Sequence, residues 1–254
     1  GERMTSKKVL QWLTKMRPEI VHVSPRPELQ DPERILTGRV QSDIHEFCEG
    51  FESGFDPTWF SSWRDEEPAF EETGSWTEAH AMRKIGQILP PGFGIFLGNG
   101  MPIRDADHFL FPSEPRSFFA NRGLSGIDGN IATLAGLAEE MPMLGIIGDQ
   151  AALYDLNSLP LLKKAKHPAI LLISNNFGGG IFHHLPIAAS PHFEQFWANA
   201  HDMHFAKAAS MFDLPYMSFA EMQFDQTGVV ELITDRSENA RYQKTCHPSL
   251  SLSS

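Results

Sequence analysis

Two short loops hold residue types that bind a hard cation and a phosphate. Gly148, Asp149 and Gln150 follow one predicted strand, and residues 175–180 (Asn-Asn-Phe-Gly-Gly-Gly) follow the next. The carboxylate of Asp149, the amide oxygen of Asn176 and a nearby backbone carbonyl are oxygen ligands that suit Mg²⁺ or Ca²⁺. The helix predicted after Gly148 would offer free N–H groups to a diphosphate, and the diphosphate would supply further oxygen ligands.

Each loop alone has a simpler interpretation. Asp149 could only cap the helix that follows it, and residues 175–180 could be a glycine-rich turn. These residues are not a phosphate loop of the GxxxxGK type, because the lysine of that motif is missing. The two loops together favour a ligand site, because they end consecutive strands of a predicted parallel sheet and would therefore lie side by side.

An alternation of short apolar runs and helical patterns predicts the elements that position these loops. From Trp76 onward we expect strands at 94–98, 117–120, 143–147, 169–174 and 229–234. Helices are expected at 77–89, 130–139, 152–164, around 204–211 and at 236–243. This order predicts an α/β fold, a parallel sheet with helices on both faces. Ligand-binding loops would then follow Gly98, Ala120, Ile147 and Ser174.

The residues before Trp76 predict a smaller unit and a linker. A helix capped by Thr5 or Ser6 and ended by Pro18, a strand at 20–23 and a helix at 40–51 indicate a partial α/β domain over residues 1–52. Residues 53–75 are acidic and lack periodicity, so we expect a linker there. The large domain would cover residues 76–254.

Charge and composition exclude several function classes. The 254 residues carry a formal net charge of −11, which disfavours binding to nucleic acid or to an anionic membrane. An anionic ligand would therefore need a local cationic site. The apolar runs are far shorter than the roughly 20 residues of a membrane span. With only Cys48 and Cys246 and no apolar signal segment, the chain is expected to be cytoplasmic.

The two loops are similar to the thiamine-diphosphate-binding motif, in which a Gly-Asp pair precedes an Asn-Asn pair. Here 26 residues separate Asp149 from Asn176, and Gln150 stands where the motif usually has Gly. Further segments resemble the 2-succinyl-5-enolpyruvyl-6-hydroxy-3-cyclohexene-1-carboxylate synthases of menaquinone biosynthesis. They are residues 98–107, 121–133, 148–159, 175–186 and 234–240, while 5–13 and 24–32 resemble the end of that family's central domain.

The resemblance implies a thiamine-diphosphate-binding fold and a set of cofactor residues. Asp149 and Asn176 would bind Mg²⁺, or Mn²⁺ in its place, through their side chains. Gly178 would bind it through its carbonyl, with the carbonyls of Phe177 and Gly180 as alternatives. The diphosphate would face Gly148 and the N–H groups that follow it, including that of Gln150. Ile127 would support the bent conformation of the cofactor.

The resemblance also implies the reaction and the residues around the reacting atoms. The family decarboxylates 2-oxoglutarate on the thiazolium of the cofactor and adds the product to isochorismate. Arg104 and Arg122 match arginines that face substrate carboxylates, for which bidentate guanidinium pairing is suited. Their alternatives are a local ion pair for Arg104 and a structural bridge for Arg122. An apolar wall would comprise Ile181, Phe182 and Leu185, unless these are ordinary core residues.

The resemblance further indicates an incomplete enzyme. In the family, the glutamate that activates the cofactor lies in an N-terminal pyrimidine-binding domain, which the neighbouring subunit commonly presents. We therefore expect a homodimer or homotetramer, and negligible synthase activity from this C-terminal portion alone. Two alternatives stay open: another thiamine-diphosphate-dependent enzyme acting on a 2-oxo acid, and a non-catalytic cofactor-binding module. Gly100 replaces a serine that is common in the family, so one substrate hydroxyl contact would be missing.

Overall fold

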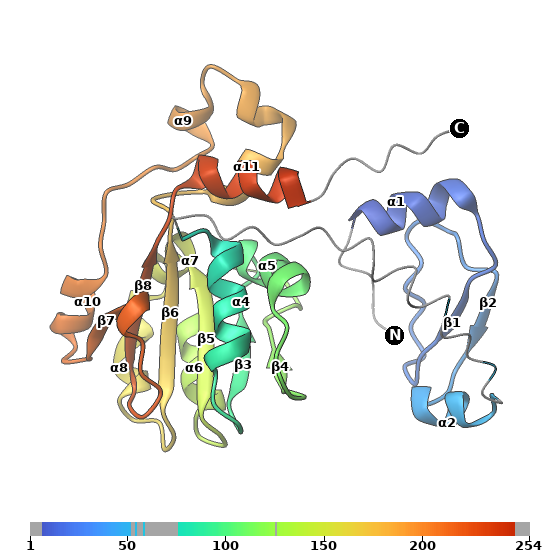
Figure 1. Ribbon diagram of the computed structural model, residues 1–254, viewed down its shortest axis with the longest axis horizontal. Helices are drawn as coiled ribbons and strands as arrows, with labels where there is room; N and C mark the ends of the chain where they lie inside the picture. The colour runs from blue at the N-terminus through green and yellow to red at the C-terminus, as the bar shows by residue number, and fades with distance from the viewer. Residues whose placement is uncertain (1–6, 52–53, 55–57, 59–75, 125, 247–254) are drawn as a thin grey trace. The chain divides into compact units, whose positions relative to one another are not determined.

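The computed structural model describes residues 7–51, 54, 58, 76–124 and 126–246 (Figure 1). The chain divides into two compact units, residues 1–67 and 68–254. The proposed cap residues Thr5 and Ser6 and nearly all of the expected linker at 53–75 lie outside the described residues. No helix among the described residues is long and apolar enough to cross a membrane.

The first unit is a small α/β arrangement. Its helices are α1 (Lys7–Met16) and α2 (Ile44–Glu49), and its strands β1 (Val21–Val23) and β2 (Gly38–Val40) pair in parallel. The expected helix at 40–51 was therefore wrong at its start, because Val40 pairs with Val23 in the sheet. The helix begins only after Asp43, whose carboxylate accepts the backbone N–H of His45.

The second unit is built on a six-stranded parallel sheet in the order β4-β3-β5-β6-β8-β7. This confirms the predicted fold class. The strands are β3 (Gly94–Leu97), β4 (Phe118–Phe119), β5 (Met143–Gly148), β6 (Ala169–Asn175), β7 (Tyr216–Ser218) and β8 (Gly228–Ile233). The three-residue edge strand β7 was missed, because so short a segment has too little alternation to identify it.

Helices cover both faces of this sheet. Successive side chains of its central strands point to opposite faces, and those on both faces are apolar. Leu144 and Ile146 of β5 pack with α4 (Glu78–Ile88), α5 (Met101–Phe109) and α11 (Arg236–Cys246). Met143 and Ile147 pack on the opposite face with α6 (Asn130–Leu137), α8 (Leu159–Leu162) and α10 (Ala206–Met211). Figure 1 shows α4 and α6 on the two sides of the sheet.

Two helices differ from the sequence predictions. The single helix expected at 152–164 is instead α7 (Asp149–Leu153), the 3₁₀ helix η1 (Leu156–Ser158) and α8. Pro160 lies in the first turn of α8, where a proline lacking an N–H starts a helix instead of continuing one. Helix α5 was missed, although Pro102 at its start is the usual signal. The other short elements are η2 (Gly180–His184), η3 (Pro186–Ala189), α9 (Phe193–Phe196) and η4 (Phe219–Glu221).

Candidate functional site

The register of two neighbouring strands brings the two predicted loops together. Gly148, the last residue of β5, pairs with Ser174 of β6, so the polypeptide leaves both strands at the same edge of the sheet. A cavity of about 270 Å³ lies there. Its lining includes all six of the predicted cofactor residues, namely Ile127, Gly148, Asp149, Gln150, Asn176 and Gly178.

Asp149 begins α7 and is buried, with 2% of its surface exposed. Its Oδ1 accepts the backbone N–H of Gln150 at 2.6 Å, and its Oδ2 accepts that of Gly178 at 2.9 Å. The Nε2 of His201 lies 3.3 Å from the same Oδ2. Burial raises the pKa of Asp149, and the two backbone donors and His201 partly offset that rise. The N-cap position of α7 is Gly148, so Asp149 is not a helix cap, and its carboxylate bonds the second loop instead.

Asn176 has one end of its amide bonded and the other end free. Its Nδ2 donates to Oε1 of Glu78 at 2.7 Å, 98 residues away in the chain. Its Oδ1 is buried, and among the described residues it has no hydrogen-bond partner. A buried amide oxygen without a partner is costly unless a ligand or water completes it. The free oxygen of Asn176 therefore suits a cation ligand.

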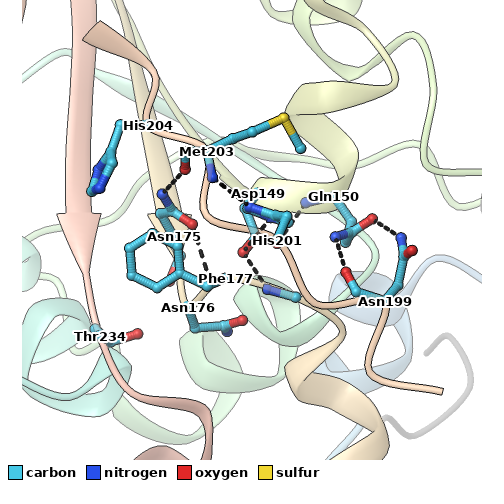
Figure 2. A network of polar contacts seen from close by, with 12 residues as sticks. Asp149, Gln150, Asn175, Asn176, Phe177, Asn199, His201, Met203, His204 and Thr234 are labelled. Atoms are coloured by element: carbon cyan, nitrogen blue, oxygen red, sulfur yellow. Dashed lines mark hydrogen bonds and ion pairs between the residues drawn. The ribbon is translucent and has the colours of Figure 1, made fainter. Parts of the chain in front are cut away.

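The loop after β6 has an unusual backbone conformation, and Figure 2 shows the polar contacts that Asn175 makes at its start. Phe177 has φ of 61° and Gly178 has φ of 152°, both in the region that side chains disfavour. Asn175 holds the start of the loop, because its Oδ1 accepts the N–H of Phe177 and its Nδ2 donates to Glu231 at 2.6 Å. The carbonyl of Gly178 accepts the N–H of Gly180 at 2.9 Å.

Glu231 is the buried anchor of this loop and was missed from sequence. Its carboxylate accepts Nδ2 of Asn175, Nδ1 of His204 at 3.2 Å, the N–H of Phe205 at 3.2 Å and the hydroxyl of Tyr216 at 2.6 Å. Burial, followed by the bond to Glu231, raises the pKa of Tyr216. Because Glu231 lies in the middle of apolar strand β8, no loop motif marks it.

Gln150 and Asn199 close one side of the cavity. The Nε2 of Gln150 donates to the carbonyl of Asn199 at 3.2 Å, and the Nδ2 of Asn199 donates to Oε1 of Gln150 at 2.5 Å. Both residues line the cavity, and Figure 2 shows the two hydrogen bonds between them. Asn199 was not predicted, because it lies in an irregular segment 49 residues from Gln150.

A pair of buried acids lies beneath the cavity. Glu78, which lines it, shares a hydrogen bond with Asp105 of α5, and Asp105 also accepts Nε2 of Gln243. Burial and the charge of Glu78 raise the pKa of Asp105 well above its usual range. Burial also raises the pKa of Glu78, although its donors Asn176 and Ser174 oppose that rise. Of the two acids, Asp105 is the one whose pKa is raised well above its usual range, and the two groups titrate as a coupled pair.

The two predicted substrate arginines meet at Asn99. Arg104 donates to the carbonyls of Asn99 and Gly100 at 2.9 and 2.5 Å, and Arg122 donates to Oδ1 of Asn99 at 3.0 Å. Burial and the charge of Arg122 lower the pKa of Arg104. Asn99 and Gly100 line the cavity, whereas Arg104 and Arg122 are not among its lining residues. Among the described residues, Arg104 forms no ion pair with Asp105 or Asp107, and its guanidinium bonds backbone carbonyls instead.

The predicted apolar residues divide into two groups. Ile181 and Phe182 of η2 line the cavity. Ile127 also lines it and is 42% exposed, while its carbonyl accepts Nδ2 of Asn130 at 2.7 Å. Leu185 is 48% exposed and is not among the lining residues. None of these four is an ordinary buried core residue.

Among the described residues, no group of three or more His, Cys, Asp or Glu side chains is arranged to hold a metal ion. A cation at this site would therefore depend on one carboxylate, an amide oxygen and backbone carbonyls. This is the oxygen-rich donor set that Mg²⁺ accepts when a phosphate and water complete its shell.

Several curated proteins share sequence with the chain over most of its length. A 2-succinyl-5-enolpyruvyl-6-hydroxy-3-cyclohexene-1-carboxylate synthase of Rubrobacter xylanophilus is 35% identical over 262 residues, which covers 92% of this chain and 45% of that protein. The synthase of the same name from Salinibacter ruber is 31% identical, covering 94% of the chain and 45% of that protein. The chain matches the C-terminal portion of the synthases of this family.

The match to the synthase family is partial in length. The Cronobacter sakazakii synthase is 35% identical over 224 residues, covering 85% of the chain and 40% of that protein. The chain thus spans less than half the length of these three relatives, and it is similar to their C-terminal portion. No family model matches the chain.

Proposed function

We propose that this chain holds the diphosphate end of thiamine diphosphate through a divalent cation, as part of a synthase of the family named above. The observation that carries the proposal is that Asp149 and Asn176 line one cavity, where the Oδ1 of Asn176 is buried and has no hydrogen-bond partner among the described residues. Mg²⁺, or Mn²⁺ in its place, would bind both oxygens. Gly178 would add its carbonyl, and the backbone of residues 148–151 would face the diphosphate.

The surrounding residues would orient the cofactor and exclude water from its reacting end. When bound, thiamine diphosphate supplies the nucleophilic carbon for decarboxylating a 2-oxo acid and forming a carbon–carbon bond. Ile127 would press against the cofactor from one side. Ile181 and Phe182 line the same cavity and would exclude water beside the reacting atoms, with Leu185 at the exposed margin.

The substrates would be 2-oxoglutarate and isochorismate, both of which carry carboxylates. Arg104 and Arg122 would receive these groups, and their shared contact with Asn99 would hold two cations near the cavity in an acidic chain. The pyrimidine half of the cofactor would be bound by a separate domain of the same or a neighbouring subunit. A homodimer or homotetramer, and a cytoplasmic location, remain predictions.

Calorimetry with the 254-residue chain tests the cofactor proposal. Thiamine diphosphate should bind in the presence of Mg²⁺, and binding should be lost when the metal is removed with EDTA. Binding that is absent, or that is unaffected by EDTA, would contradict it. The release of carbon dioxide from 2-oxoglutarate by the chain alone should be negligible, because the activating glutamate would come from the pyrimidine-binding domain.

The two alternatives predict different results in the same experiments. Another 2-oxo acid enzyme would bind the cofactor but would not depend on Arg104 and Arg122 for 2-oxoglutarate. A non-catalytic module would bind the cofactor and show no turnover, even with a pyrimidine-binding domain supplied. The shared Asn99 contact of the two arginines favours the synthase.

A further inference from the structure

Glu78 is a buried carboxylate that joins the ends of two strands. It is the first residue of α4 and is 4% exposed. Its Oε1 accepts Oγ of Ser174 at 3.0 Å, Nδ2 of Asn176 at 2.7 Å and Oγ1 of Thr234 at 3.4 Å. Ser174 and Asn176 lie at the end of β6, and Thr234 directly follows β8. All three bonds meet at one oxygen that can only accept.

The contact with Glu78 decides which end of the Asn176 amide faces the cavity. With Nδ2 on Glu78, the amide oxygen points away from the carboxylate and is buried without a hydrogen-bond partner in the part of the chain that the structure describes. A flipped amide would place two acceptor oxygens against each other at hydrogen-bond distance and would turn an N–H group toward the cation. Both effects are unfavourable.

Gly180 leaves room for the same amide. A Cβ atom at residue 180 would lie 2.7 Å from Nδ2 and 3.3 Å from Oδ1 of Asn176, so a larger residue there would displace the amide. The N–H of Glu78 donates to Oδ1 of Asn239 in α11 at 3.1 Å. Glu78 is therefore bonded through its backbone to α11 and through its side chain to the ends of β6 and β8.

We infer that Glu78 is a positioning residue that holds the Oδ1 of Asn176 toward the cation of the cofactor. This inference rests on the proposed function, since it assigns Glu78 to the same cation. It does not make Glu78 a ligand. Its role is to supply an acceptor that only the nitrogen end of the amide can satisfy.

The test uses Mn²⁺ as the probe, with free Mn²⁺ measured by electron paramagnetic resonance in the presence of thiamine diphosphate. Glu78→Gln removes the preference for one orientation of the Asn176 amide, because a glutamine can present either a donor or an acceptor to it. We expect the Mn²⁺ dissociation constant to rise about 10-fold or more, as for other outer-shell partners of metal ligands. The thermal unfolding of each variant reports separately on folding.

A double variant separates positioning from a general loss of structure. In Glu78→Gln with Asn176→Asp, the new glutamine can donate to one oxygen of the new aspartate, which leaves the other oxygen facing the cation. We expect its Mn²⁺ affinity to return to within about threefold of the unmodified chain. Asn176→Asp alone should bind Mn²⁺ poorly, because the carboxylate of Glu78 would then lie against the carboxylate of the new residue 176.

The control is Asp155→Asn, which also removes a buried carboxylate. Asp155 accepts the N–H of Ile131 at 2.6 Å and is not among the lining residues, so Mn²⁺ affinity should be unchanged. An unmodified chain that binds no Mn²⁺ with the cofactor would overturn the proposed function and this inference together. This inference alone would be overturned if Glu78→Gln and the unmodified chain had equal Mn²⁺ affinity. It would also be overturned if the double variant did not recover the Mn²⁺ affinity.

Discussion

The backbone N–H of Gly178 donates to Oδ2 of Asp149 at 2.9 Å and so bonds the loop after β6 to the loop after β5. The donor and acceptor are 29 residues apart in the chain. This bond joins the two loops at the edge of the sheet where the cavity lies.

Gly178→Ala should distort the loop after β6. A Cβ there would lie 2.6 Å from the carbonyl oxygen of Ala198 and 2.9 Å from Nη1 of Arg236, with φ at 152°. We expect a loss of about 1–3 kcal/mol in unfolding free energy and weaker cofactor binding. Denaturant unfolding and calorimetry measure the two effects.

The matched control for that glycine is Gly136, an exposed residue of α6 with open space around it. Gly136→Ala should stabilise the chain by about 0.5–1 kcal/mol and leave cofactor binding unchanged. If both alanine variants gave the same stability, the strain assigned to Gly178 would be wrong.

Tyr216→Phe should loosen the anchor of the loop without touching the cavity. It removes the hydroxyl that donates to Glu231 at 2.6 Å, which should cost about 1 kcal/mol. Tyr154→Phe is the control, because Tyr154 is 64% exposed, and we expect a change below about 0.5 kcal/mol. Equal unfolding midpoints for the two variants would argue against Glu231 as an anchor.

Asp105→Asn should change how stability depends on pH. The pKa of Asp105 is raised in the folded chain, so the folded state binds more protons than the unfolded state above about pH 4. Stability contributed by this group is present at low pH and falls as pH rises, by at most about 1.4 kcal/mol per pH unit. The asparagine can still donate to Glu78 and accept from Gln243, but it does not ionise.

The expected result for Asp105→Asn is a variant that gains stability relative to the unmodified chain as pH rises from about 4.5 to 8. Urea unfolding at several pH values measures the difference. Asp107→Asn, at an exposed acid in the same helix, should leave the profile unchanged. If the curves of stability against pH were parallel for Asp105→Asn and the unmodified chain, the pKa of Asp105 would not be raised in the folded chain.

Arg104→Met and Arg122→Met should affect the 2-oxo acid and not the cofactor. Both side chains bond Asn99, which lines the cavity. We expect 2-oxoglutarate to bind about 10-fold or more weakly to the cofactor-loaded chain, and the cofactor to bind within about threefold of normal. Calorimetry measures both. Arg241→Met is the control, because Arg241 is exposed and pairs with Glu238; an equal loss there would contradict the assignment.

The fold and the two loops were predictable from sequence because they depend on local patterns. Apolar strands separated by helices require a parallel sheet, and the ends of β5 and β6 must then lie together. That reasoning placed Asp149 and Asn176 at one edge of the sheet. The division of the helix expected at 152–164 into α7, η1 and α8 was missed. Pro160 is a signal for it, but the apolar pattern continues across the break.

The residues that hold the loops were not predictable in the same way. Glu78 reads as an ordinary acidic residue in the first turn of a helix, and Glu231 as a lone acid inside an apolar strand. Each contacts the loop after β6 from 56 to 98 residues away in the chain. Only the packing of α4 and β8 against β6 shows that their carboxylates meet Asn175 and Asn176.

The most direct test of the cation site compares the Mg²⁺-dependent affinity of thiamine diphosphate for the unmodified chain, Asp149→Asn and Asp155→Asn. Both variants remove one buried carboxylate, but only Asp149 lines the cavity. The proposed function predicts a loss of about 30-fold or more for Asp149→Asn and a change within about threefold for Asp155→Asn. Equal affinity of Asp149→Asn and the unmodified chain in Mg²⁺ would contradict it.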